Sequence, residues 1–354
     1  MNSSASTNNN PATTRAAEIK QRARLLGFDL VGITTALPPP HANHFQRWLA
    51  DSFHGEMGYM SKNAPKRLTP SDVLPNARSI VIAGLNYYTG DRESAGRIAR
   101  YAWGTSDYHD IMANMLNQLS HAIRELGGTG TQTKSYVDTG PILERDLAQR
   151  AGVGFIGKHT NLISRKLGNW IFLGEVLTNL DLPPDKPEGE YCGTCHRCID
   201  TCPTRAIIGP YQLDARLCIS YLTIELKGSI PVELRPLIGD HVFGCDDCLE
   251  VCPWNRFARQ SPVREFQSRK LPALTEFLSW NEEKFRDFFR GTPIFRIKRR
   301  GFLRNICVAL GNIGGESALP ALKAALEDVE PLVREHAAWA IQQIQRRPSG
   351  TMAA

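Results

Sequence analysis

Eight of the nine cysteines lie in one short block, between residues 192 and 252. The first half of the block, residues 192–203, reads C-x2-C-x2-C-x3-C-P, which is the spacing of bacterial two-cluster ferredoxins. In that motif three thiolates hold one iron–sulfur cluster, and the fourth ligates the other cluster. The block therefore predicts a second cluster as well as the first.

The ligands of the second cluster follow in a shorter run at residues 245–253, C-x2-C-x3-C-P, in which Cys218 can replace the missing first cysteine. Zinc is the alternative metal, since paired C-x2-C motifs also form tetrahedral sulfur sites. A third close cysteine and two Cys-Pro ends favour two [4Fe-4S] clusters, and the absence of a secretion signal disfavours disulfides. The assignment that closes both sites is Cys192, Cys195, Cys198 and Cys252 on one cluster, with Cys202, Cys218, Cys245 and Cys248 on the other.

Asp138 is a candidate site residue because it follows an apolar stretch at residues 134–137. Ends of strands are where α/β folds place their ligands. The alternative is that this carboxylate caps the turn into the helix expected at residues 141–151. Residues 152–157 spell G-x-G-x-x-G, but they follow a predicted helix instead of a strand, which disfavours a dinucleotide site.

Three further residues are expected to be structural. His109 and His159 lack the spacing of a metal site and are interpreted as hydrogen-bonding residues. Cys307 lies on the apolar face of a predicted helix and is expected in the core.

The order of predicted elements indicates an α+β or α/β multidomain protein. An amphipathic helix near residues 17–26 precedes a strand at 29–34, and further strands are expected at 79–86, 134–137 and 169–178, with a helix at 108–126. We expect a disordered tail at 1–14, an α/β domain at 15–185, a ferredoxin-type domain at 186–262 and a helical domain at 263–354. A Pro-rich acidic stretch at 181–190 is interpreted as the linker into the ferredoxin-type domain.

The C-terminal segment combines a basic stretch with a faint repeat. Residues 302–313 align with residues 333–344, a pattern typical of paired HEAT-like helices. Basic and aromatic side chains alternate just before and within the first repeat. A solvated helix face is one interpretation, and a phosphate-backbone contact through Lys298, Arg299 and Arg300 is the other.

Composition excludes several classes of protein. The chain has 354 residues, 42% of them hydrophobic, which is enough for a sizeable core. No run of eighteen apolar residues exists, so we expect a monomeric cytoplasmic protein that does not enter a membrane. The net charge of +6 mildly favours an anionic partner.

The whole pattern resembles the epoxyqueuosine reductases, cobalamin-dependent iron–sulfur enzymes of tRNA modification. Besides the eight block cysteines, the resemblance rests on the stretches K-R-L-T-P (66–70), R-Y-A-W-G (100–104), D-Y-H-D (107–110), V-D-T-G (137–140), G-F-I-G-K-H-T (154–160) and A-A-W-A-I (337–341). It covers nearly the whole chain apart from the polar N-terminal residues.

The resemblance implies the last step of queuosine biosynthesis, reduction of epoxyqueuosine at the wobble position of tRNAs with GUN anticodons. It implies that the N-terminal domain holds cobalamin, that the clusters reduce it with electrons from an external low-potential donor, and that Asp138 is the proton donor. The implied cobalamin contacts are Arg67, Ala99, Asp138, Lys158, His159, Thr160 and Asp246. No D-x-H-x-x-G motif occurs, which fits a base-off cofactor.

Two other functions remain open at this point. A cobalamin-dependent reductase of a small molecule, similar to the reductive dehalogenases, would use the same cofactors but would leave the basic segment unexplained. A non-catalytic electron carrier would need the clusters alone, and its N-terminal domain would bind a protein.

Overall fold

An antiparallel four-stranded sheet forms the centre of the N-terminal half. The computed structural model describes residues 11–91 and 96–347. The strands β1 (Leu30–Thr35), β2 (Ser79–Asn86), β7 (Ile171–Thr178) and β4 (Thr133–Tyr136) lie side by side in that order, and every neighbouring pair is antiparallel. The expected strands are confirmed, but the domain is α+β, because alternating helices and strands do not fix strand direction.

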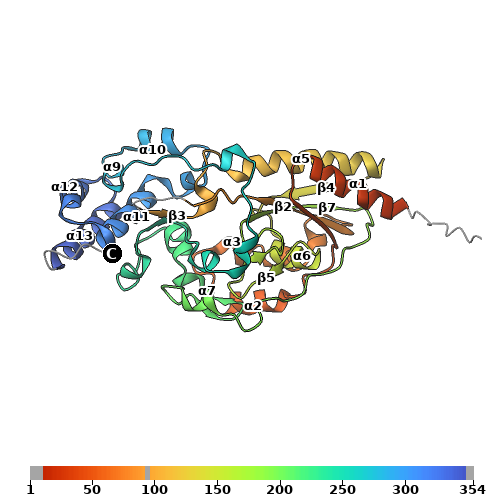
Figure 1. The fold of residues 1–354 in the computed structure, drawn as a ribbon, viewed down its shortest axis with the longest axis horizontal. Coiled ribbons are helices and arrows are strands. Elements are labelled where there is room, and N and C mark those ends of the chain that lie inside the picture. Colours follow the sequence, from red (N-terminus) through yellow and green to blue (C-terminus); the bar gives the residue numbers. More distant parts are fainter. Residues whose placement is uncertain (1–10, 92–95, 348–354) are drawn as a thin grey trace, which may run out of the picture.

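Helices cover both faces of this sheet. The two helices α1 (Pro11–Leu25) and α5 (Tyr108–Gly127) pack on one face, and α6 (Glu144–Arg150) packs on the other (Figure 1). Ile19 of α1 and Leu116 of α5 are buried in the first core, and Leu147 of α6 is buried in the second. Each layer therefore buries one apolar helix face against the strands.

The predicted N-terminal tail needs a correction. Residues 11–14 are helical, because α1 includes Pro11 and buries Ala16 and Ile19 one turn further on. Proline is well tolerated in the first turn of a helix, where its missing N–H is not needed. The rest of the expected tail, residues 1–10, lies outside the described residues.

Short elements connect the sheet to the cysteine block. They are α2 (Ala42–Ala50), α3 (Gly58–Lys62), α4 (Ala64–Leu68), β3 (Arg97–Ile98), β5 (Phe155–Ile156), β6 (Leu162–Ile163), α7 (Arg197–Asp200), β8 (Ile207–Gly209), β9 (Gln212–Leu213), β10 (His241–Phe243) and α8 (Asp247–Glu250). The strand β3 pairs in parallel with β10. The expected linker is held in place, since Asp185 accepts a hydrogen bond from the backbone N–H of Ile33 at 2.8 Å.

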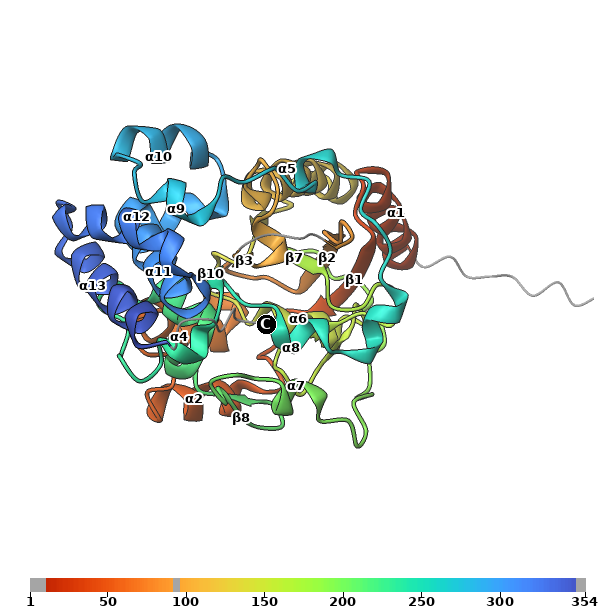
Figure 2. The ribbon, with the colours of Figure 1, turned by 60° about the vertical axis from the view of Figure 1, so that its left-hand side comes forward.

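The C-terminal helices form the predicted HEAT-like pair. The helices α11 (Lys298–Ile313) and α13 (Pro331–Arg346) pack against each other, with α12 (Leu319–Ala324) between them in the chain (Figure 2). Two further helices, α9 (Leu274–Phe277) and α10 (Glu282–Phe289), lie beside them. The predicted repeat is confirmed by the buried Ala309 and Ala340, which occupy equivalent positions in α11 and α13.

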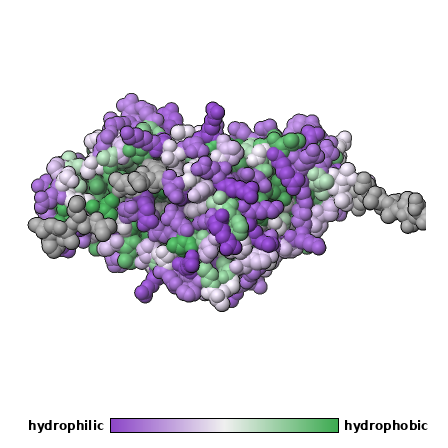
Figure 3. All heavy atoms as spheres, in the orientation of Figure 1, coloured by the Kyte–Doolittle hydropathy of each residue, from purple (hydrophilic) through white to green (hydrophobic). Residues whose placement is uncertain are grey.

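The surface is largely hydrophilic on the face shown in Figure 3, with hydrophobic patches over the C-terminal helices. Among the described residues, no helix is both long enough and apolar enough to span a bilayer.

Candidate active site

Asp138 lies in the loop between β4 and α6 and makes two side-chain contacts. Its Oδ2 accepts a hydrogen bond from the Tyr108 hydroxyl, and its Oδ1 lies 2.7 Å from Nε2 of His109. The backbone of Asp138 is in the left-handed region, with φ of 44°. Such strain in a residue with a side chain is often found at functional sites. The helix-cap alternative is wrong, because the cap position of α6 is Leu143 and no side chain caps this helix.

His109 connects two carboxylates at the start of α5. Its Nδ1 lies 2.6 Å from Oδ1 of Asp107, so each ring nitrogen faces a carboxylate oxygen. Burial opposes the charged form, but the hydrogen bonds to Asp107 and Asp138 prevail and raise the pKa of His109. The Arg296 guanidinium lies 3.0 Å from Nδ1. These contacts agree with the prediction of His109 as a hydrogen-bonding residue and place it beside Asp138.

The Asp138 loop borders a cavity of about 780 Å³. Its wall includes Arg67, Tyr101, Tyr108, His109, Glu144 and Arg296 as well as the thiol-bearing Cys218. A second cavity of about 330 Å³ adjoins it and shares Met60, Arg67, Glu144 and Arg145. Cofactor sites commonly have volumes of ~300–1,000 Å³. The space beside Asp138 is therefore large enough for a cofactor or a nucleotide.

A half-buried glutamate, Glu144, and a fully buried one, Glu175, lie near this cavity, and neither was predicted from the sequence. Burial raises the pKa of Glu144, and Arg145 partly opposes this effect. Burial also raises the pKa of Glu175 well above its usual value, with the neighbouring Glu144 adding to the shift. Neither carboxyl oxygen of Glu175 has a hydrogen-bond partner among the described residues. Burial away from water disfavours the charged form of this carboxyl group.

The structure brings the block cysteines close to one another, and their division into two sets of four stays a prediction. The first set lines one cavity of about 220 Å³: Cys192, Cys195, Cys198 and Cys252. The thiols of the predicted second set raise one another's pKa values. After burial, the charge of Cys218 makes the largest contribution to raising the pKa of Cys248, and Asp246, Cys202 and Cys198 of the first set contribute as well. Cys245 likewise has its pKa raised by burial and then by surrounding charges that include Cys248 and Cys218.

The remaining predicted cobalamin contacts do not all surround one cavity. Arg67 is buried and donates to the carbonyl oxygens of Gly140 and Ile142 at 3.2 and 3.0 Å, while its Nε has no partner among the described residues. Thr160 lines the smaller cavity next to Arg67. The structure thus places these two residues with Asp138 around adjoining cavities.

The other four lie elsewhere. Lys158 donates to the carbonyl oxygens of Gly193 and Cys195 at 2.7 and 2.9 Å. His159 borders the first cysteine set, and burial lowers its pKa to about 4. Ala99 and Asp246 line a separate, smaller cavity. There Asp246 accepts a hydrogen bond from the backbone N–H of Arg100 at 2.6 Å, and burial raises its pKa to about 6.

The three predicted tRNA contacts at the start of α11 differ in exposure. Lys298 and Arg300 are exposed. Arg299 is buried, where it pairs with Asp328 and donates to the carbonyl oxygen of Trp280 at 2.6 Å. We therefore correct the prediction for Arg299, because its guanidinium is already committed inside the protein. The exposed Arg296 instead extends the basic surface to the Asp138 cavity.

Comparison with known families identifies the class of this protein. Residues 191–255 match the 4Fe-4S double cluster binding domain, residues 67–139 match the family described as Epoxyqueuosine reductase QueG, DUF1730, and residues 308–328 match the PBS lyase HEAT-like repeat. A fold that combines this double-cluster domain with an acid-bearing cavity defines an iron–sulfur oxidoreductase.

Whole-chain relatives specify the family. The epoxyqueuosine reductase of Pseudomonas aeruginosa is 44% identical over 342 residues, covering 93% of this chain and 94% of that protein. A crystal structure of epoxyqueuosine reductase with a tyrosine tRNA stem loop carrying epoxyqueuosine has a TM-score of 0.83 and 33% identity, covering 93% of this chain and 89% of that chain.

A Bacillus subtilis epoxyqueuosine reductase, with an aspartate catalytic loop swung out of its active site, has a TM-score of 0.83 and 32% identity, covering 93% of this chain and 90% of that one. This chain belongs to the epoxyqueuosine reductase family, and it is a reductase. The family assignment favours an enzyme over the alternative of a non-catalytic electron carrier.

Proposed function

We propose that this protein reduces epoxyqueuosine to queuosine at the wobble position of the GUN-anticodon tRNAs for Asp, Asn, His and Tyr. The observation that carries the proposal is the Asp138 loop, which places a carboxylate held by Tyr108 and His109 on a cavity of cofactor size. Further support comes from the related structure that contains an epoxyqueuosine-modified stem loop. In this proposal the protein acts as a monomer in the cytoplasm.

Two [4Fe-4S] clusters would supply the electrons. We assign the first to Cys192, Cys195, Cys198 and Cys252, which line one cavity, and the second to Cys202, Cys218, Cys245 and Cys248. Cys218 also lines the Asp138 cavity, so the second cluster would lie next to the reaction site. An external low-potential donor would load the first cluster, which is bordered by the exposed Arg197 and Arg256.

Cobalamin fits the two adjoining cavities. A corrin is bulky and carries amide side chains, and the cavities offer both volume and polar groups such as the unpartnered Nε of Arg67. We propose that Arg67, Thr160 and Asp138 lie around it, and that it is bound base-off. When bound, cobalamin would supply a strongly reducing, nucleophilic metal centre. Ala99, Lys158, His159 and Asp246 stay weaker candidates, because they line other cavities or lie beside the clusters.

Asp138 would deliver a proton to the epoxide oxygen. Removing that oxygen as water converts the epoxide to an alkene and consumes two electrons and two protons, so an acid beside the substrate is required. Both oxygens of Asp138 accept hydrogen bonds, and the neighbouring His109 has its pKa raised. We propose that the proton reaches Asp138 from His109, and that Tyr108 fixes the orientation of the carboxylate.

Nucleoside analysis of treated tRNA tests the proposed function. The reconstituted protein, with cobalamin and a chemical reductant, is incubated with epoxyqueuosine-containing tRNA, and the digested nucleosides are analysed by mass spectrometry. We expect loss of one oxygen atom from the modified base, and no conversion when cobalamin is omitted. An intact epoxide despite full cluster and cobalamin loading would overturn the proposal.

A further inference from the structure

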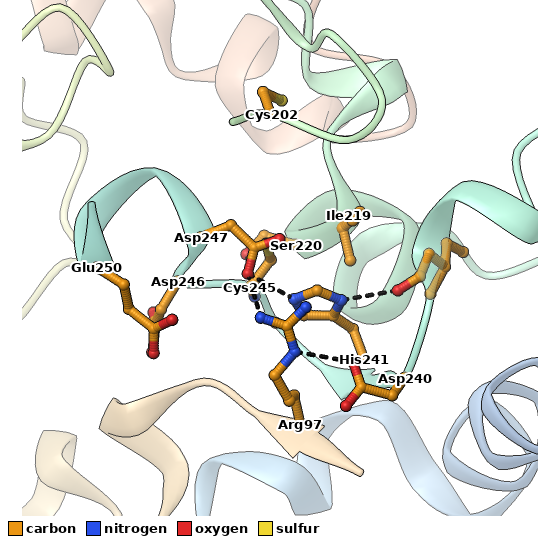
Figure 4. Close-up of polar contacts among 12 residues, drawn as sticks. Arg97, Cys202, Ile219, Ser220, Asp240, His241, Cys245, Asp246, Asp247 and Glu250 are labelled. Carbon is orange, nitrogen blue, oxygen red and sulfur yellow. Dashed lines mark hydrogen bonds and ion pairs between the residues drawn. The ribbon is translucent and has the colours of Figure 1, made fainter. Parts of the chain in front are cut away.

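A polar network lies beside Cys245, away from Asp138, and borders the small cavity that Ala99 and Asp246 also line. Arg97 is the first residue of β3, Asp240 directly precedes β10, His241 is the first residue of β10, and Asp247 is the first residue of α8. We call these four residues the Asp247 network (Figure 4). Its members come from segments about 150 residues apart in the chain, and the β3–β10 pairing brings them together.

Asp247 is the centre of this network. Its Oδ1 accepts a hydrogen bond from Nη1 of Arg97 at 2.6 Å and lies 3.0 Å from Nε2 of His241. Nε of Arg97 donates to Oδ1 of Asp240 at 2.8 Å, and Nδ1 of His241 donates to the Ile238 carbonyl oxygen at 2.7 Å. The side chain of Asp247 is only 11% exposed, whereas that of Arg97 is 46% exposed. The carboxylate is therefore fixed in one position and shielded from water.

The same carboxylate lies close to a predicted cluster ligand. Single side-chain ligand atoms of His241, Cys245 and Asp247 all lie within 4.8 Å of one another. A mononuclear metal site is disfavoured, because both ring nitrogens of His241 already have partners and Cys245 belongs to the second cysteine set. The close approach therefore places a fixed negative charge beside the sulfur of Cys245.

We propose that Asp247 is a positioning residue that lowers the reduction potential of the cluster held by Cys245, and that Arg97 opposes this effect. Adding an electron next to a fixed negative charge costs energy, and the cost is larger where water is excluded. Nearby charges and solvent exposure are among the factors that set cluster potentials. The proposal rests on the ligand assignment in the proposed function.

Paired charge removals test this proposal. Both cluster potentials are measured by redox titration monitored by EPR, with iron content determined for each protein. We expect Asp247→Asn to raise the reduction potential of the Cys245 cluster. At a fixed applied potential, the ratio of reduced to oxidised cluster should then increase on the order of tenfold. Arg97→Gln should lower the same potential by less, because this side chain is half exposed, and Arg97→Lys should stay near the parent value.

The controls separate tuning from damage. Asp287→Asn removes an exposed carboxylate of α10, outside the cysteine block, and should leave the potential of the Cys245 cluster unchanged. The proposal would be overturned if both variants carry full clusters and neither potential changes. It would also be overturned if Asp247→Asn and Arg97→Gln shift the potential in the same direction. Either result would leave the ligand assignment intact. A parent protein with only one cluster would overturn the ligand assignment and this proposal together.

Discussion

The contacts of His109 with two carboxylates should make the folding stability of the protein depend on pH. Its pKa is raised in the folded protein, so the stability it contributes is fully present below its ordinary value of 6.5 and is lost as pH rises through the raised value. Asp107, Asp138, Arg296 and Tyr108 face it.

We predict that His109→Asn lowers the free energy of unfolding by about 1 kcal/mol near pH 6 and by less near pH 9. Chemical denaturation at the two pH values measures the difference. A loss of equal size at both values would show that the charge of His109 contributes nothing. The variant should also slow turnover, if the proton reaches Asp138 from this histidine.

Single residues show where sequence reasoning succeeds and where it stops. The cysteine spacing is a local pattern, so the double-cluster domain could be predicted from the chain alone. The partners of Asp138 could not, because Tyr108 and His109 come from a helix that begins 30 residues earlier. Glu175 is hidden within an apolar strand, and only the folded sheet shows that its carboxyl group is buried without a partner.

At the scale of elements, the first turn of α11 contains a buried basic residue, Arg299, next to an exposed one, Arg300. Arg299→Ala breaks a buried ion pair with Asp328 and should destabilise the protein by about 3–5 kcal/mol. Arg300→Ala should leave stability unchanged and weaken tRNA binding, with the salt slope reduced by about one unit. Thermal unfolding and binding isotherms at several salt concentrations distinguish the two. Equal slopes for the parent and Arg300→Ala would place the tRNA contact elsewhere.

The packing of α11 on α13 offers a second test at this scale. A Cβ on Gly311 would collide with Trp339 and lie 3.0 Å from Cα of Ala340, so Gly311→Ala should cost about 1–3 kcal/mol. Gly301 lies in the same helix, and a Cβ there meets nothing closer than 3.4 Å. Gly301→Ala should therefore be neutral or stabilising by up to ~1 kcal/mol. Equal effects of the two changes on thermal unfolding would contradict the helix pairing.

The crossed arrangement of the cysteine block is tested by a matched pair of cysteine changes. In our assignment Cys202 is a ligand of the second cluster, but it belongs to the cysteine motif at residues 192–203 that binds the first. Cys202→Ala should therefore damage both clusters. The parent should hold about eight iron atoms, and the variant fewer than the roughly four that loss of one cluster alone would leave. Cys307 is buried in α11, outside the block, and Cys307→Ala should retain full iron content. A Cys202→Ala protein with about eight iron atoms would refute the assignment.

At the scale of the whole molecule, local patterns in the sequence located individual elements better than the contacts between them. The cysteine block, the HEAT-like pair and the buried strands could be located from local patterns. The antiparallel order of the sheet and the β3–β10 pairing depend on contacts between distant segments. Long-range contacts also bring Asp138, Cys218 and Arg296 to the wall of one cavity.

The turnover of Asp138→Asn tests the central claim most directly, since this change keeps the size of the side chain but removes its acid. Single-turnover conversion of epoxyqueuosine-containing tRNA is compared with the parent, after cluster content, cobalamin content and tRNA affinity are matched. We predict normal loading and binding with a rate about 100 to 10,000 times lower. A fully loaded Asp138→Asn protein that converts the substrate at the parent rate would contradict the assignment of Asp138 as proton donor.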